Sequence, residues 1–95
     1  MVVGKSNFPL GKFAKKLQEF GISKKQAEEL EFHLLEFDIF ISGFKKHIAK
    51  IIRCNEKDKI KDLLEDLWGE FEHHIIPNHL LPAKDILDNI TNKIK

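Results

Sequence analysis

The sequence predicts an all-α protein, and three observations support that class. Apolar residues recur at spacings of three and four over most of the chain, which is the period of a helix packed on one side. Glycine and proline, which interrupt helices, number only five and three in 95 residues. Apolar residues make up 42% of the chain, enough to form a core. We therefore expect one helical domain over residues 1–95, a three- to four-helix antiparallel bundle with a long central helix.

The first helix is predicted over residues 9–20. Pro9 suits the first turn, where its missing N–H has no helical partner to lose. Ser6 or Asn7 can cap this end with a side-chain oxygen. Gly21 follows at the position where helix ends favour glycine. The apolar face of this helix consists of Leu10, Phe13, Leu17 and Phe20.

The long central helix is predicted over residues 24–54. Ser23 and Gln26 form a capping box, in which the serine hydroxyl accepts from the Gln26 amide. Apolar spacings then alternate between four and three, as in a coiled coil, through Leu30, Leu34, Phe37, Ile41, Phe44, Ile48 and Ile51. A second apolar strip lies roughly opposite and consists of Phe32, Leu35 and Ile39. Gly43, after Ser42, can kink the helix or admit another backbone.

The third helix is predicted from Lys57 to Ile75. Its amphipathic face consists of Ile60, Leu63, Leu64, Leu67, Trp68, Phe71 and Ile75. Pro77 is expected to end this helix, because proline lacks the backbone donor and its ring clashes with the preceding turn. A short turn over residues 78–81 then leads to a last helix that opens at Pro82 or Ala83. That helix carries Ile86, Leu87, Ile90 and Ile94.

The two apolar strips of the central helix predict a dimer. A helix that is apolar on two sides is usually sandwiched between neighbours, and residues 32–44 offer more apolar surface than one neighbour can bury. We therefore expect a homodimeric helical bundle. The alternative is a monomeric four-helix bundle in which the central helix is kinked at Gly43.

Charge is segregated along the chain, although 16 Lys and Arg nearly balance 15 Asp and Glu. Formal charge alternates in four blocks: +5 over residues 1–25, −5 over 26–44, +5 over 45–61 and −4 over 62–95, which together give +1. Such alternation suits neighbouring helices or a symmetric partner whose charges are complementary. The small net charge argues against a strongly basic nucleic-acid binder.

Composition also bears on location. No window approaches 18 consecutive apolar residues, so we expect no transmembrane helix. The first residues lack the apolar stretch and cleavage site of a secretory signal. One cysteine, Cys54, cannot form an internal disulfide, which favours a reducing compartment. These observations predict a cytoplasmic protein.

A basic stripe defines one function hypothesis. Lys46, Lys50, Arg53 and Lys57 are spaced four, three and four, so they share a helix face and can contact phosphates. The simpler interpretation is a solvated face with cations near a helix C-terminus. There is no Tyr, and the eight Phe fall mostly on core spacings, so stacking aromatics are not evident. We do not expect nucleic-acid binding.

Histidines and carboxylates define a second hypothesis. The chain has five histidines: His33, His47, His73, His74 and His79. Glu70 and His73 form a Glu-x-x-His motif, the type that binds two metal ions in helical bundles. Folding the chain back near Asn55 brings Glu36 level with this motif, so the candidate metal ligands are Glu36, Glu70, His73 and His74. A di-metal bundle needs two such motifs and one chain shows one, whereas surface Glu–His pairs need no metal.

The leading expectation is therefore a small cytoplasmic helical protein of the protein–protein interaction or regulatory kind, without catalytic residues or a cofactor. Its partner is a second copy or another protein. The alternatives are a metal-binding helical bundle with a di-metal carboxylate and histidine site, and a weak nucleic-acid binder that uses the basic stripe over residues 46–57.

Overall fold

The protein is built from helices, as a computed structural model shows for residues 6–93. Along the chain lie α1 (Lys12–Glu19), α2 (Lys24–Arg53), α3 (Lys57–Glu70), the π-helix η1 (Phe71–Leu80) and α4 (Leu81–Lys93). No strand occurs within residues 6–93, so the predicted all-α class is confirmed. No helix in that part of the chain is both long and apolar enough to cross a bilayer.

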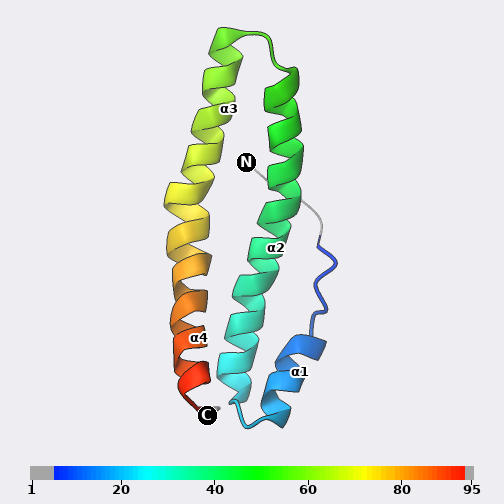
Figure 1. Cartoon of the computed structure of the whole chain (residues 1–95), viewed down its shortest axis with the longest axis vertical. Helices are drawn as coiled ribbons and strands as arrows, with labels where there is room; N and C mark the ends of the chain where they lie inside the picture. The colour runs from blue at the N-terminus through cyan, green and yellow to red at the C-terminus, as the bar shows by residue number, and fades with distance from the viewer. Residues whose placement is uncertain (1–5, 94–95) are drawn as a thin grey trace.

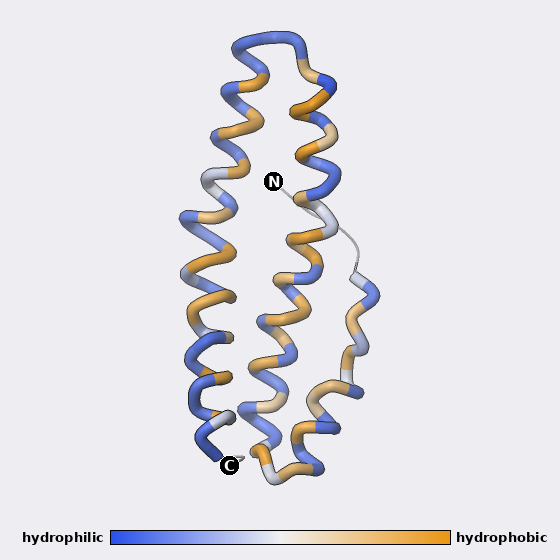
Figure 2. Tube along the Cα trace, in the orientation of Figure 1, coloured by the Kyte–Doolittle hydropathy of each residue, from blue (hydrophilic) through white to orange (hydrophobic). Residues whose placement is uncertain are grey.

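The helices form a long hairpin with a short helix beside it (Figure 1). α2 is one arm, and the chain reverses over residues 54–56. α3, η1 and α4 follow end to end as the second arm, each in contact with α2. α1 packs beside α2 at the end of the hairpin where α4 ends. Hydrophobic and hydrophilic residues alternate along both arms (Figure 2), which is the pattern of amphipathic helices.

The predicted span of the central helix is confirmed to within one residue, since α2 stays helical from Lys24 through Ser42 and Gly43 to Arg53. Its first turn is capped as expected, because the Gln26 amide donates to the Ser23 hydroxyl over 3.2 Å.

The end of α1 is closed by a local backbone motif, also as predicted. Gly21 has φ 90°, the left-handed region that favours glycine. The Gly21 amide donates to the Gln18 carbonyl over 3.1 Å, and the Ile22 amide donates to the Leu17 carbonyl over 3.2 Å. Together these bonds form a Schellman motif, which satisfies the last carbonyls of the helix.

The predicted start of α1 is wrong. The helix begins at Lys12, after Gly11 with φ 85°, and neither Ser6 nor Asn7 caps it. The cap comes from α2: a carboxylate oxygen of Glu31 accepts from the amides of Gly11 and Ala14, each over 2.9 Å. Glu31 is only 6% exposed. A buried carboxylate at a helix N-terminus satisfies amides that the helix itself cannot.

The prediction that Pro77 ends the third helix is also wrong. The chain continues through Pro77 in the π-helix η1, where backbone hydrogen bonds span five residues. In an α-helix, residue 77 would donate to the His73 carbonyl, which proline cannot do. The side-chain amide of Asn78 donates to that carbonyl instead, over 3.4 Å. The wider turn and this replacement donor let the second arm run on into α4.

The core consists of two apolar clusters. The first joins α1, α2 and α4 through buried Ala14, Ile22, Ala27, Leu30, Ala83 and Ile90. The second lies between α2, α3 and η1 around buried Phe40 and Ile75, with Phe37, Ile41, Phe44 and Leu67 packed against it. On α2, His33 and Glu36 lie between buried Leu30 of the first cluster and buried Phe40 of the second, and on the second arm His79 lies between Ile75 and Ala83. We call these polar side chains, together with His74, the polar layer.

Candidate metal centre

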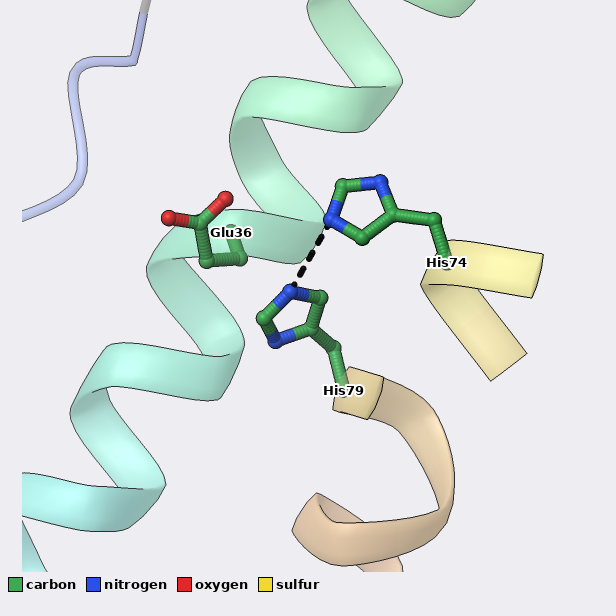
Figure 3. A group of neighbouring side chains, drawn as sticks. All are labelled: Glu36, His74 and His79. Atoms are coloured by element: carbon green, nitrogen blue, oxygen red, sulfur yellow. Dashed lines mark hydrogen bonds between the residues drawn. The ribbon is translucent and has the colours of Figure 1, made fainter. Parts of the chain in front are cut away.

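Two histidine side chains of η1 converge at this polar layer, facing α2 (Figure 3). The Nε2 atoms of His74 and His79 lie 3.1 Å apart. Glu36 lies nearby on α2, and one potential ligand atom of each of the three residues lies within 4.8 Å of the other two. The site therefore offers two imidazole nitrogens and a carboxylate oxygen from two different elements.

The π-helix is what brings the two histidines together. His74 and His79 are five residues apart, so at 100° per residue an α-helix would place them about 140° apart around its axis. In a π-helix each turn is wider and bonds run from residue i to i+5. Residues five apart then stack on nearly the same side. The local geometry of Phe71–Leu80 thus creates the pair.

The outer nitrogen of each imidazole is held by another side chain. His74 Nδ1 lies 3.0 Å from a Glu70 carboxylate oxygen, one turn earlier on the same arm. His79 Nδ1 lies 3.1 Å from His33 Nδ1 on α2. Metal-ligating histidines almost always have this arrangement, in which a second residue fixes the ring and leaves the other nitrogen for the ion. These contacts hold both rings with their Nε2 atoms facing each other.

Without a metal, the four side chains form one directed chain of hydrogen bonds. An ionised Glu70 can only accept, so His74 donates to it from Nδ1 and a neutral His74 accepts at Nε2. His79 then donates from Nε2, and its Nδ1 accepts from His33. These tautomers follow from the pairing of donors and acceptors along the network. Both ring nitrogens of His74 and both of His79 therefore have a partner.

His79 is the most enclosed member of the site. It is 6% exposed, and the Phe32 ring packs edge-to-face on it with ring centres 5.6 Å apart. Burial lowers the pKa of His79 below its usual value of 6.5, and the neighbouring His74 and His33 lower it further, whereas Glu36 acts in the opposite direction. His79 is therefore neutral at neutral pH, which is the form that binds metals.

This pKa predicts how stability changes with pH. The unfolded chain binds a proton at His79 near pH 6.5, whereas the folded chain binds it only at lower pH. His79 should therefore cost no stability above pH 6.5, and stability should fall as the pH drops from there towards the folded pKa. Thermal unfolding of the wild type and of His79→Gln between pH 7.5 and 5.5, in chelator, measures the contribution. A wild-type loss no larger than that of the variant would exclude His79 as its source.

The remaining histidines lie outside the cluster. His73, a candidate ligand from the sequence, is exposed and its ring meets the Trp68 ring edge-to-face at 5.3 Å. His47 is buried, and its Nε2 lies 2.6 Å from the Leu63 carbonyl, where it donates and ties α2 to α3. Of the predicted ligands, Glu36 and His74 meet at the site and Glu70 lies behind His74. His79 and His33 are the members that the sequence-based set lacks.

The basic stripe lies on the surface. Its members Lys46, Lys50, Arg53 and Lys57 are all exposed.

The chain matches no protein-family model, no curated protein and no solved structure. The polar layer is the part of the described structure where side chains able to bind a ligand converge, and its donor set of two histidines and a carboxylate is that of known metal sites.

Proposed function

We propose that the protein binds a divalent transition-metal ion through His74, His79 and Glu36. One observation carries this proposal: the Nε2 atoms of His74 and His79 face each other at 3.1 Å while both outer nitrogens are held by other side chains. Two nitrogens bound to one tetrahedral zinc ion lie about 3.3 Å apart, given Zn–N bonds of about 2.0–2.1 Å. The histidine pair is therefore already spaced to share an ion.

The cost of the polar layer supports the same conclusion. Replacing a paired set of buried polar groups by apolar side chains of the same shape is nearly neutral or even stabilising, so this paired layer adds little to stability. Proteins accept such conflicts mainly at functional sites. Apolar side chains could fill the same space, as they do in the clusters on either side.

The donor set indicates which ions fit. Imidazole nitrogens suit zinc, iron, copper and nickel, whereas magnesium and calcium prefer oxygen ligands. Two histidines with one carboxylate occur both in zinc sites and in non-haem iron(II) sites that keep open positions. We propose Zn²⁺ or Fe²⁺ as the ion, with water at the remaining positions. Glu36, whose carboxylate lies within 4.8 Å of the imidazole nitrogens, would have to move closer to coordinate the ion.

A metal titration of the wild-type chain, purified without a histidine tag, tests this function. We expect one Zn²⁺ per chain by elemental analysis after dialysis. A hundredfold excess of free ion over the dissociation constant should stabilise the fold by about 2.7 kcal/mol, which raises Tm by roughly 10–20 °C in a domain of this size. Fe²⁺ under anaerobic conditions should act similarly, and Mg²⁺ should not. No bound Zn²⁺ or Fe²⁺ and no change in Tm would refute metal binding.

We also propose that the chain self-associates into a larger helical bundle, in line with an interaction role. The supporting observation is the exposure of large apolar side chains on α3, where Leu64 is 50% and Trp68 61% exposed. Contiguous exposed apolar surface usually marks an interaction site. The single free cysteine, Cys54, fits a reducing compartment, and we propose the cytoplasm.

A further inference from the structure

Apolar side chains form a stripe along α3 that runs into the first residue of η1. We call this the α3 stripe: Leu64, Trp68 and Phe71 are exposed, whereas Ile60 and Leu67 are partly buried. Two shallow hollows on it share Leu64 and Trp68 as walls. The second of them shares Phe71 with a third hollow, between α2 and η1, whose lining is wholly apolar. The three hollows therefore form one continuous apolar face.

No other helix covers this face within residues 6–93. α3 contacts only α2 and η1 among the described elements, and none of its residues is buried. α1 packs on α2 and against the apolar cluster shared with α4, and it does not contact α3. Two helices cannot enclose each other's apolar sides, which is why stable bundles contain three or four. The α3 half of the hairpin thus lacks the helices that would complete a bundle.

The open face is long. From Ile60 to Leu80 it extends about 30 Å, at 1.5 Å per residue, which is more than half of the 53 Å length of the molecule.

Charge along the hairpin indicates what covers the face. The tip, residues 45–61, carries seven Lys and Arg against two carboxylates, a net +5. The adjoining part of α2, residues 26–44, carries five carboxylates and no Lys or Arg, a net −5. The facing part of the second arm, residues 62–80, likewise carries five carboxylates and no Lys or Arg, a net −5. Each hairpin therefore has a basic tip and an acidic middle.

We infer that the α3 stripe binds a second copy of the chain in antiparallel orientation, so that the basic tip of each hairpin lies along the acidic middle of the other. A two-fold axis across the stripe pairs the same apolar surface with itself, as an isologous dimer requires, and places opposite charges side by side. A parallel pair would bring two +5 tips together. Two hairpins in this arrangement supply the four helical arms of a bundle, of which one chain has two. The inference rests on the proposed self-association.

Sedimentation equilibrium in the presence of a chelator tests whether the stripe is the interface. The wild type should give twice the 11.1 kDa mass of the chain, and Trp68→Glu should give the monomer mass with unchanged helicity, because Trp68 is exposed. Leu87→Glu on α4 is the matched control, since Leu87 is also exposed but lies off the stripe, and it should stay dimeric. A monomeric wild type refutes self-association itself, and a dimeric Trp68→Glu refutes this interface.

Cysteine cross-linking tests the orientation. Cys54, the only cysteine, lies at the tip, so a short bis-maleimide should not join two wild-type chains if they are antiparallel. Glu65 borders the stripe near its middle, so Glu65→Cys in a Cys54→Ser background should cross-link efficiently. Cross-linking through Cys54 would show a parallel dimer and overturn the orientation while leaving self-association standing. A dimer that cross-links at neither position would overturn the α3 interface.

Discussion

His79→Ala is expected to weaken Zn²⁺ binding by at least about 100-fold. Removal of a residue that only supports a ligand costs about 10–100-fold in affinity, and loss of a ligand should cost more. His79 contributes one of the two facing nitrogens and also ties His33 to the site. Without it, His74 and Glu36 leave one nitrogen and one carboxylate for the ion. Competition with a chromophoric chelator measures the affinity.

Two further variants calibrate this result. His73→Ala should bind Zn²⁺ like the wild type, since the exposed His73 contacts Trp68 and not the cluster. Glu70→Ala should weaken binding about 10–100-fold, because Glu70 only orients His74 through Nδ1. Circular dichroism in chelator shows whether each variant is folded. Wild-type affinity in a folded His79→Ala, or a large loss in His73→Ala, would contradict the proposed ligand set.

Features set by neighbouring residues were predicted well from the sequence. The Ser23 cap and the Gly21 motif each involve bonds between residues at most five apart, so the local sequence is enough to place them. The bounds of α2 follow from such signals and from a long apolar repeat. The reversal near Asn55 was likewise visible as a break between two amphipathic patterns.

The site depends on a backbone geometry that helical periodicity does not describe. Sequence reasoning placed Glu36 near Glu70 and His73, but it assigned His79 to a turn beyond Pro77. The π-helix moves His79 back onto the face of His74. The available signal was His74 and His79 five residues apart across Pro77, with Asn78 able to replace the donor that proline lacks. An isolated spacing of five is weak evidence unless the π-helix is already known.

Glu31 shows the other limit of local reasoning. In the sequence it is one of five carboxylates in an acidic block, between apolar positions Leu30 and Phe32. Its role appears only when α1 folds back on α2, because the amides that it binds lie 17 and 20 residues earlier. A cap supplied from another helix leaves no pattern at the helix start. The expected cap at Ser6 or Asn7 was therefore wrong, and Ser6 donates to Asp38 instead.

Glu31→Ala is expected to destabilise the fold by about 2–4 kcal/mol. The change leaves the amides of Gly11 and Ala14 without their acceptor, and a buried donor that loses its partner costs about 1–3 kcal/mol. Ala14 is 3% exposed, so water cannot replace the carboxylate there. In a domain of this size the loss corresponds to a fall in Tm of roughly 10–25 °C. Thermal and urea unfolding followed by circular dichroism measure it.

Glu28→Ala is the matched control, because Glu28 is an exposed carboxylate on the same helix, and it should change stability by less than about 0.5 kcal/mol. Glu31→Gln should fall between the two, since its amide oxygen can still accept but carries no charge. Amide exchange in Lys12–Glu19 should rise most in Glu31→Ala, because α1 depends on this carboxylate for its N-terminus. Equal stability of Glu31→Ala and Glu28→Ala would mean that α1 is held by its apolar contacts with α2 and α4 alone.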